Sequence, residues 1–369
     1  MPNKIYIRSA ATVTALGLTL DETWMNLQSG ETASRDIDRF STAAIDHKKA
    51  ALVRENWFSG TRDLQEELLE TVLSQLPSLS TPPFIIWTGV KSNTPFIESE
   101  GGYPLKDGAG FRENAAEYLK IPNRGIELNA ACASSAAGLA LGAMMIKSGK
   151  ADSVLICSAD KVSRFIHFGF SSLKALSSYP ARPFDLDRDG LNLGDGASAV
   201  LLCGEKVLNG DAPLAELAGW GIANDANHIT GPARDGRGLV LAVKQALNTA
   251  SAGSADVAAF CAHGTGTRYN DSMEVEALKQ IFGETPPPVF SLKGAVGHTL
   301  GAAGGIETAV CVKALKEKTV PPTAGIENPE PYLANRISSK PQAIGKGCLL
   351  TTNSGFGGVN AALLIKDLS

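Results

Sequence analysis

Cys132 stands in the segment NAACASS, residues 129–135, where a cysteine could act as a nucleophile. A strand is expected at 125–129 and a helix at 134–148, so the thiol would lie at the turn between them. Near the positive end of a helix dipole a thiol ionises more readily, by roughly 0.3–1 kcal/mol, and up to about 2 kcal/mol when partly buried. We therefore expect a lowered pKa for Cys132, with further lowering from a neighbouring base or imidazolium. On this segment alone, a buried cysteine packed in a tight turn is an equal alternative.

A second segment, AHGTGT at residues 262–267, follows another apolar run and places His263 at the carboxyl end of a strand. Ligands of α/β sheets usually bind at this end of the strands. The hydroxyl groups of Thr265 and Thr267 can donate and accept hydrogen bonds, which suits a ligand that carries amide groups. The alternative is a loop histidine that caps a turn.

Lys293 and His298 occupy a third segment, SLKGAVGHTLGAAGG at residues 291–305, which leads into a helix rich in alanine and glycine. Glu307 follows in that helix, nine residues after His298. The chain has no GxxxxGK[ST] phosphate loop, and the glycine spacing here does not fit the GxGxxG dinucleotide loop. A solvated lysine and a satisfied histidine are the alternative interpretation.

The fourth segment, NSGFGGVN at residues 353–360, predicts a loop with exposed backbone N–H groups. Gly355 and Gly357 flank Phe356, so N–H groups there can point at a ligand oxygen and form an oxyanion hole. A plain glycine turn between two strands is the alternative. Taken together, one cysteine, two histidines, one lysine and an amide-rich loop, each beside a strand end, favour acyl transfer through a thioester.

Short apolar runs alternate with helical patterns throughout the chain, which is typical of an α/β protein. Several runs lack the alternation of a half-exposed strand, so we expect strands buried on both faces. The sequence predicts strands at 4–7, 84–87, 125–129, 153–158, 197–203, 215–222, 257–262, 289–291, 348–353 and 361–365. It predicts helices at 20–28, 62–76, 110–119, 134–148, 239–251, 272–282 and 302–316.

The order of elements repeats weakly along the chain. Residues 129–147 and 291–313 both run from a strand through a turn of small residues into a long helix. We therefore predict two similar halves that meet near a polar turn. The first half, residues 1–205, carries the cysteine, and the second half, residues 206–369, carries both histidines, the lysine and the GFGG loop.

Composition excludes several classes of protein. With 44% hydrophobic and 20% charged residues over 369 positions, the chain can bury a large core and is neither disordered nor fibrous. A net charge of −4 without a basic stripe argues against nucleic-acid binding. No apolar stretch reaches the roughly 20 residues of a membrane span and no signal peptide is evident, so we expect a cytoplasmic protein. The six cysteines form no CxxC pair, and we expect no metal site.

The four segments, in this order, resemble those of the β-ketoacyl synthases of the thiolase superfamily, the elongating type with a Cys-His-His set. The likeness covers most of the chain, and it includes TALG at 14–17, ETWMNLQSG at 22–30 and PFDLDRDGLNLGDGA at 183–197. The resemblance implies the α/β thiolase fold, in which two similar halves form a layered αβαβα sandwich. His298 disfavours the initiating synthases, which have a Cys-His-Asn set. Degradative thiolases are disfavoured because the GFGG motif contains no second cysteine.

The resemblance also implies the catalytic roles. Cys132 would be the nucleophile that takes the acyl chain from a carrier-protein thioester. His263 and His298 would assist decarboxylation of a malonyl extender and hold the developing enolate. Lys293 would orient the site and stabilise its charge, and Glu307 would support it.

Further roles follow from the same resemblance. The backbone N–H groups of Cys132 and Phe356 would bind the thioester oxyanion, and Phe356 would act as a gate. Thr265 and Thr267 match positions that bond the phosphopantetheine arm, and Phe170 matches an aromatic residue of the acyl pocket. No cofactor is implied beyond the phosphopantetheine of an acyl carrier protein. The carrier protein is the expected partner, together with a second copy of the chain or a related subunit.

The implied reaction is a decarboxylative Claisen condensation that gives a β-ketoacyl-carrier protein, in fatty acid or type II polyketide synthesis. Three departures from the family pattern stand out: Ser354 replaces a phenylalanine before GFGG, Asp195 replaces a glutamate, and residues 94–124 lack much of the usual cap. The short cap suits a specialised polyketide or aryl-polyene-like pathway. It also motivates a second hypothesis, a chain-length-factor-like subunit of a heterodimer with little activity of its own, although such subunits commonly lose the nucleophile.

Overall fold

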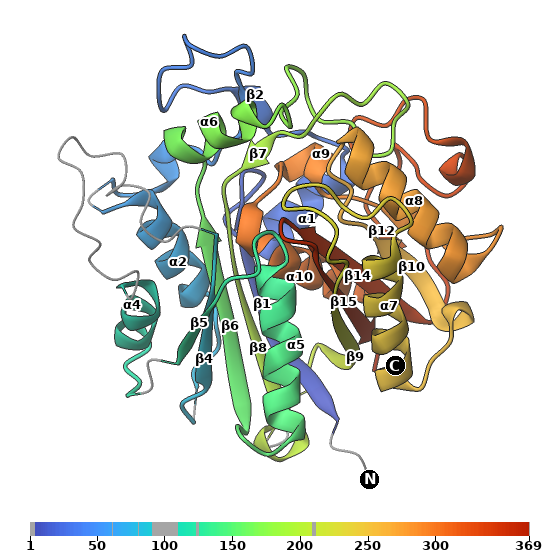
Figure 1. Cartoon of the computed structure of the whole chain (residues 1–369). Helices are drawn as coiled ribbons and strands as arrows, with labels where there is room; N and C mark the ends of the chain where they lie inside the picture. Colours follow the sequence, from blue (N-terminus) through green and yellow to red (C-terminus); the bar gives the residue numbers. More distant parts are fainter. Residues whose placement is uncertain are drawn as a thin grey trace.

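A mixed sheet of ten strands runs through the molecule (Figure 1). The computed structural model describes residues 4–60, 62–79, 81–90, 110–122, 125–208 and 212–368, with only the backbone for residues 110–112. In spatial order the strands are β11 (Val289–Phe290), β10 (Val257–Cys261), β14 (Cys348–Gly355), β15 (Val359–Lys366), β9 (Ala215–Asn224), β1 (Ile5–Thr14), β8 (Gly196–Gly204), β6 (Ser153–Asp160), β4 (Phe84–Thr88) and β5 (Ile126–Leu128).

The sheet repeats one pattern on either side of the seam between β1 and β9. From the seam outward, each half has two antiparallel pairings followed by two parallel ones. The seam itself is short, because β1 and β9 pair only at Tyr6 with Glu216 and at Ile7 with Ala215. Two five-stranded units of the same topology therefore meet here, as the repeat in the sequence predicts. The bounds 1–205 and 206–369 stay a prediction.

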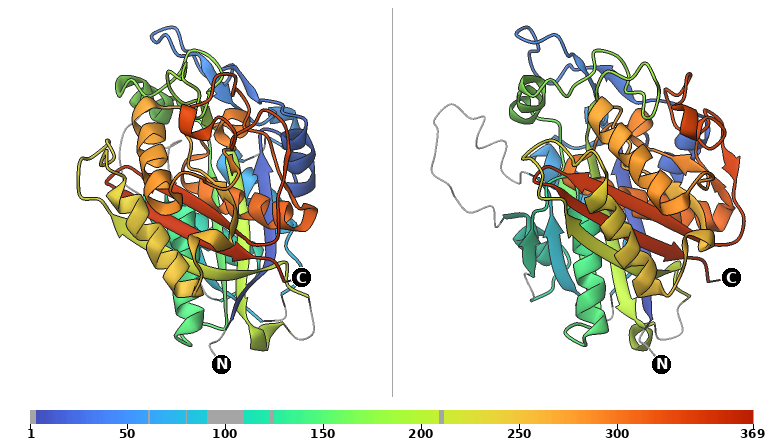
Figure 2. Two further views of the ribbon diagram at one scale, coloured as in Figure 1. Left: turned by 90° about the vertical axis from the view of Figure 1, so that its right-hand side faces the viewer. Right: turned by 45° about the vertical axis from the view of Figure 1, so that its right-hand side comes forward.

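Helices form three layers around these two units (Figures 1 and 2). α5 (Ser134–Lys147) and α10 (Ala303–Glu317) pack on each other and contact strands of both units, so they form the middle layer. α2 (Leu64–Ser74) and α4 (Gly110–Tyr118) cover the first unit, and α7 (Arg237–Ala250) and α8 (Arg268–Phe282) cover the second. In Figure 2, α7 lies along the outer side of β14 and β15. This is the expected α/β fold with its layered αβαβα sandwich.

Small residues allow the two middle helices to pack closely on each other and on the strands. A Cβ atom built on Gly304 of α10 would lie 2.8 Å from the Cβ of Ala136 in α5. A Cβ on Gly305 would lie 2.0 Å from the Oγ of Ser198 in β8. Only glycine permits approaches this close, so these positions fix how near the helices come to each other and to the strands. The turns that precede the two helices are thereby held at the centre of the molecule.

The structure contains all ten predicted strands and all seven predicted helices, with ends that differ by a few residues. The largest difference is β1, which continues to Thr14 because residues 9–14 pair with β8 although the apolar run is interrupted. Seven further α-helices and β-strands of the described structure were not predicted, and six of them have only two to four residues, too few for a periodic pattern. They are β2 (Ser34–Asp36), β3 (Lys49–Ala51), α6 (Arg164–Ser172), β7 (Leu193–Gly194), α9 (Lys293–Val296), β12 (Thr319–Val320) and β13 (Gln342–Ala343). The helix α1 (Leu20–Gln28) has the bounds that the sequence predicts.

Candidate active site

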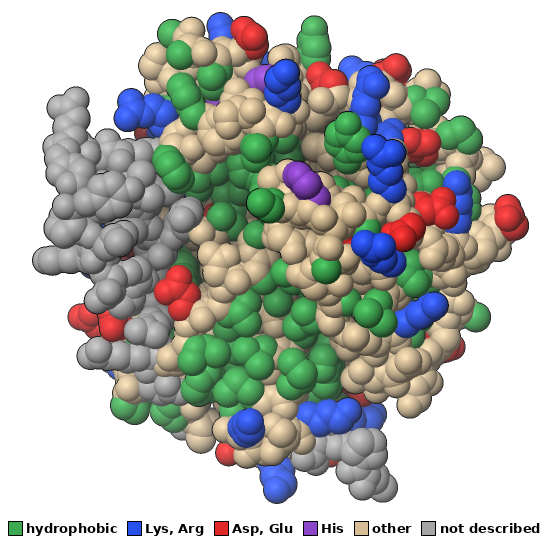
Figure 3. Space-filling model, viewed as in Figure 1, with side chains coloured by type: hydrophobic (Ala, Val, Ile, Leu, Met, Phe, Trp, Pro, Cys, Tyr) green, Lys and Arg blue, Asp and Glu red, His purple; other side chains and the backbone are tan. Residues whose placement is uncertain are grey.

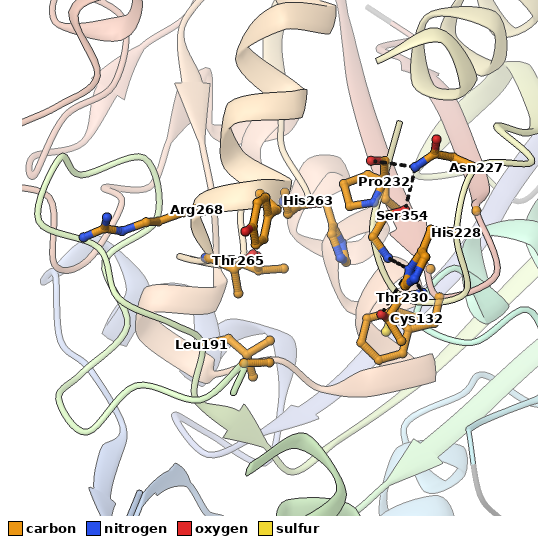
Figure 4. Close-up of a pocket in the computed structure, with 18 of the residues that line it drawn as sticks. Cys132, Leu191, Asn227, His228, Thr230, Pro232, His263, Thr265, Arg268 and Ser354 are labelled. Carbon is orange, nitrogen blue, oxygen red and sulfur yellow. Dashed lines mark hydrogen bonds between the residues drawn. The ribbon is translucent and has the colours of Figure 1, made fainter. Parts of the chain in front are cut away.

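A pocket of about 940 Å³ lies where loops of the two halves meet. The first half contributes Cys132 and Phe170, and the second contributes His263, His298 and Phe356. These residues are far apart along the chain, and the structure brings them to one pocket as the sequence predicts (Figure 4). Other predicted site residues on the wall are Thr265, Thr267 and Gly355, whereas Lys293, Glu307 and Gly357 do not line it.

The turn from β5 to α5 carries Cys132 and is held by side-chain hydrogen bonds. Ala131, just before the cysteine, has a φ of 50°, in the left-handed region that residues other than glycine rarely adopt. The Oγ of Ser134 accepts the Ala130 N–H at 2.9 Å and donates to the Ala131 carbonyl at 2.6 Å. Asn129 accepts the Ala131 N–H at 3.0 Å. A strained turn fixed in this way presents the thiol to the pocket in one orientation.

The electrostatic expectation for Cys132 is wrong. Burial is the largest effect on the Cys132 thiol, and together with a smaller contribution from the carboxylate of Asp160 it gives a net pKa of about 12. Lys293 and the backbone N–H groups of Cys132 and Phe356 lower this pKa, but they do not outweigh the loss of solvation. The sequence shows the turn and the helix dipole, but not the depth of the pocket. Cys132 is therefore a protonated thiol in the unliganded protein.

The GFGG loop packs directly on this turn. A Cβ atom on Gly355 would lie 2.7 Å from the Ala130 carbonyl and 3.2 Å from the Cys132 nitrogen, so only glycine fits there. The approach brings the Phe356 N–H beside the sulfur, where the Cys132 N–H also points. Two backbone donors therefore converge next to the nucleophile, which is the arrangement that an oxyanion hole needs. Ser354 donates instead to Asn360, at 2.7 Å, away from this pair.

The two histidine rings face each other at the base of the pocket. Their centroids are 5.2 Å apart, and the ring planes meet at 84°. Burial and the charge of Lys293 lower the pKa of both His263 and His298 well below the usual value, so both rings are neutral. The Nδ1 of His298 accepts the Leu300 N–H at 3.2 Å, which leaves the ring proton on Nε2. A neutral imidazole of this kind can donate a hydrogen bond to a developing oxyanion.

Two buried carboxylates, which the sequence analysis did not single out, hold the loop after β10. Glu274 accepts the N–H groups of His263 at 2.8 Å and of Gly264 at 2.7 Å, and Asp271 accepts the Thr265 N–H at 3.0 Å. Burial raises the pKa of Glu274 to about 8, and the nearby Asp271 contributes. The available sequence signal is an acidic pair three residues apart in α8, directly after HGTGT. The pair orients the backbone that carries His263.

Lys293 and Glu307 form a buried ion pair behind the histidines rather than on the pocket wall. The Lys293 Nζ lies 2.5 Å from the Oε1 of Glu307. The other oxygen of Glu307 accepts the Asn353 side-chain N–H at 2.8 Å. Burial raises the pKa of Glu307, and Lys293 and Asn353 partly offset this effect. The sequence analysis included Asn353 in the fourth segment but gave it no role.

The loop between β9 and α7 also lines the pocket and contributes His228, which lies outside the four segments of the sequence analysis. The Nδ1 of His228 accepts the N–H groups of Thr230 and Gly231, both at 3.1 Å. In Figure 4, His228 and Cys132 lie on the same side of the pocket. The other two histidines outside the motifs have structural positions: His47 lies 3.3 Å from the Ser171 hydroxyl, and His167 is buried.

Phe170 and Phe356 separate this pocket from a second, more apolar groove. Their rings stack with centroids 5.6 Å apart and planes at 23°. The groove, of about 960 Å³, is lined by α6 together with residues of the loop at 41–44, and it shares Phe170 and Leu173 with the first pocket.

Among the residues that the structure describes, no cluster of three His, Cys, Asp or Glu side chains could hold a metal ion. Within the same ranges, no helix has the length and hydrophobicity to cross a membrane. The expected shortening of the cap at residues 94–124 falls largely on residues 94–109 and 123–124, which lie outside the described part of the chain.

Comparisons with known proteins find related domains and relatives. Residues 118–207 match the N-terminal domain of β-ketoacyl synthases, and residues 214–327 match the C-terminal domain. A 3-oxoacyl-[acyl-carrier-protein] synthase 2 of Vibrio cholerae is 35% identical over 270 residues, which cover 68% of this chain but only 63% of that protein.

Solved structures show the same fold over the whole chain. The ishigamide ketosynthase/chain length factor superimposes with a TM-score of 0.91 at 24% identity, and all of both chains is covered. A ketosynthase in complex with its chain length factor from Xenorhabdus doucetiae gives a TM-score of 0.79 at 28% identity, over 99% of this chain and 98% of that one.

Proposed function

Because this chain belongs to the β-ketoacyl synthase family, we propose that it condenses an acyl thioester with a malonyl thioester, with loss of carbon dioxide. Both substrates would be carried by an acyl carrier protein, and the product would be a β-ketoacyl-carrier protein. One observation carries the proposal. A cysteine, two neutral histidines and two converging backbone N–H groups share a single pocket.

In the first step, the acyl group would pass from the carrier thioester to Cys132. The carbonyl oxygen would sit between the N–H groups of Cys132 and Phe356, which stabilise the charge of the tetrahedral intermediate. The sulfur of Cys132 forms the new thioester bond as the bond to the carrier sulfur breaks. Because Cys132 starts as a thiol, its proton leaves during the attack, and the departing carrier thiolate takes up one proton.

In the second step, a malonyl thioester would lose its carboxylate as carbon dioxide. The electrons of the broken bond form an enolate, whose oxygen would accept hydrogen bonds from His263 and His298. This charge develops only in the transition state, so preorganised donors act selectively there. The enolate carbon then attacks the acyl thioester and forms the new carbon–carbon bond as the bond to the Cys132 sulfur breaks; Cys132 leaves as a thiolate, which takes up one proton from solvent. Lys293, which is buried behind both rings, would add positive charge to the same region.

The pocket wall suits the arm that would deliver both substrates. The hydroxyl groups of Thr265 and Thr267 lie 2.9 Å apart on the wall, where they could bond the amide groups of phosphopantetheine. At the mouth, four basic side chains are available to the phosphate of the arm and to acidic side chains of the carrier: Lys174, Arg234, Arg237 and Arg268. Figure 3 shows Lys and Arg side chains gathered over the ends of α7 and α8 on this face. We propose no metal and no further cofactor, and a cytoplasmic site of action.

A second chain of the same fold is the other partner that we propose. Among the described strands, β5 ends the sheet on the side of the nucleophile, and its Ile126 is exposed. Met144 of the neighbouring α5 is exposed as well. Figure 3 shows hydrophobic side chains gathered over this helix. Both features would suit a subunit interface. The partner would be an identical chain or a related ketosynthase or chain-length-factor subunit.

A chain-length-factor-like role is the alternative function. The raised pKa of Cys132 is the observation that favours it, because a thiol held protonated is a poor nucleophile. The intact set of pocket residues favours the enzyme. Incubation with acyl- and malonyl-carrier protein separates the two, with Cys132→Ala as the control. We expect β-ketoacyl product from the wild-type protein alone. Equal product from both proteins would overturn the proposed activity, and product formed only after a second ketosynthase is added would favour the alternative.

A further inference from the structure

Asn353 holds its side-chain amide in an orientation that leaves one buried atom without a partner. The side chain is fully buried near the end of β14, and its Nδ2 donates to Glu307 at 2.8 Å. Its Oδ1 has no hydrogen-bond partner among the described residues. This oxygen faces Gly304, where an added Cβ would lie only 2.6 Å away. An unpaired buried acceptor is unfavourable, so another interaction must prevent the side-chain amide from rotating by 180° and exchanging Nδ2 with Oδ1.

The ion pair behind the site explains why the amide does not turn. An exchange of Nδ2 and Oδ1 would place an acceptor against the carboxylate of Glu307. That carboxylate cannot move away, because Lys293 binds its other oxygen at 2.5 Å. The charged pair therefore dictates that the NH₂ end of Asn353 points toward Glu307, and the oxygen takes the unfavourable position.

The same NH₂ group also faces His263. The distance from Nδ2 of Asn353 to Nδ1 of His263 is 3.5 Å. An amide NH₂ group has only protons to offer, so the ring atom that faces it must present a lone pair. The proton of the neutral His263 ring then lies on Nε2. His298 reaches the same state by a different route, since its Nδ1 accepts the N–H of Leu300.

We propose that Asn353 is a positioning residue that fixes the tautomer of His263, so that both rings present an Nε2–H donor to the substrate oxygen. This inference rests on the proposed function, because it assigns the donors for the enolate. The alternative tautomer would turn a lone pair of His263 toward the enolate oxygen and repel it. Acyl transfer to Cys132 would be spared, because its oxyanion is bound by backbone N–H groups.

The direct test is nuclear magnetic resonance of protein labelled with ¹⁵N at histidine, which reports the protonation of each ring nitrogen. In the wild-type protein we expect an unprotonated Nδ1 and a protonated Nε2 for His263. Asn353→Asp replaces the NH₂ group with a second acceptor, so the proton should move to Nδ1. A proton on Nδ1 in the wild-type protein would overturn the inference, and so would an unchanged tautomer in a folded Asn353→Asp protein.

Two half-reactions supply the functional test. We expect Asn353→Asp to slow decarboxylation of malonyl-carrier protein by about 100-fold or more, as loss of an oxyanion donor does. Acylation of Cys132 should stay within a few-fold of the wild-type rate. The matched control is Thr308→Val, which removes a buried hydrogen bond from the Thr308 hydroxyl to the Gly304 carbonyl in the same helix without touching His263.

The outcomes distinguish a failure of the inference about Asn353 from a failure of the proposed function. Equal loss of both half-reactions in Asn353→Asp, but not in Thr308→Val, would mean a merely structural role and would overturn the inference. If the wild-type protein performs neither half-reaction, the proposed function is wrong. The tautomer measured in the wild-type protein still decides whether Asn353 orients His263.

Discussion

Lys293 and Glu307 form a salt bridge of 2.5 Å with both side chains only 2% exposed. The pair lies between α9 and α10, behind the two histidines. It sets the charge beneath the pocket and, through Asn353, the direction of a side-chain amide. Removal of one partner would leave the other charge buried and unpaired.

Lys293→Met should therefore destabilise the protein strongly. We expect the free energy of unfolding to fall by about 3–5 kcal/mol, the usual effect of breaking a buried pair from one side. Denaturant titration measures it. The double change Lys293→Met with Glu307→Met should recover much of the loss, since no charge then remains unpaired.

The matched control for this change is a lysine in a surface pair. Lys313 lies 2.8 Å from the exposed Asp21, and Lys313→Met should cost about 0–1 kcal/mol. Equal effects of Lys293→Met and Lys313→Met would mean that the buried pair does not act as described.

The pKa of Cys132 predicts how its alkylation depends on pH. Iodoacetamide reacts with the thiolate, and a pKa of about 12 keeps the thiolate fraction small at neutral pH. The rate should therefore rise roughly tenfold for each pH unit between pH 7 and pH 10. Peptide mapping identifies the modified cysteine, with Cys132→Ser as the control. A rate that levels off near pH 8 would contradict the raised pKa and would restore the expectation from the helix dipole.

The comparison of two glycines tests the contact between the GFGG loop and the turn. In Gly355→Ala the new Cβ would meet the Ala130 carbonyl at 2.7 Å and the Cys132 nitrogen at 3.2 Å, so the oxyanion donors must shift. We expect activity to fall by about 100-fold, as with loss of one donor. Gly357 has a φ of 85°, but a Cβ there would meet nothing within 4 Å. Gly357→Ala should therefore cost about 1–2 kcal/mol of stability and little activity; a reversed order of activities would count against the contact.

Charge reversal at the pocket mouth tests carrier docking. Arg268 begins α8 and lines the pocket, whereas Lys279 of the same helix does not. Arg268→Glu should raise the KM for malonyl-carrier protein by about tenfold at low salt, with a smaller effect at high salt. Lys279→Glu is the matched control and should leave the KM nearly unchanged. Equal KM values for both variants would show that the carrier protein does not dock at Arg268.

Much of the site could be predicted because strand ends and glycine motifs are local signals. Cys132, His263 and Phe356 each lie beside a strand end, and the structure places all three in one pocket. The orientation of Asn353 could not be predicted, because it depends on Glu307, 46 residues away. The pKa of Cys132 was predicted in the wrong direction, since the sequence shows a helix start but not the burial around it.

For the fold too, local patterns could be predicted from the sequence, whereas contacts between distant segments could not. α5 and α10 repeat because small residues are required where two helices pack on each other between the two five-stranded units, and this requirement is visible in the sequence. α6 was missed although it carries Phe170 and its nine residues are clearly amphipathic at the helical period, so the sequence did contain a signal for this helix. His228 was missed because only the folded loop between β9 and α7 brings it to the pocket.

Intact-protein mass spectrometry tests the central claim most directly. The protein is incubated with an acyl-carrier thioester, and malonyl-carrier protein is then added. We predict a mass increase of one acyl group, mapped to Cys132 and absent from Cys132→Ala, that disappears as the β-ketoacyl product forms. An adduct that also appears in Cys132→Ala, or an unmodified Cys132 after exposure to a range of acyl-carrier thioesters, would contradict the account.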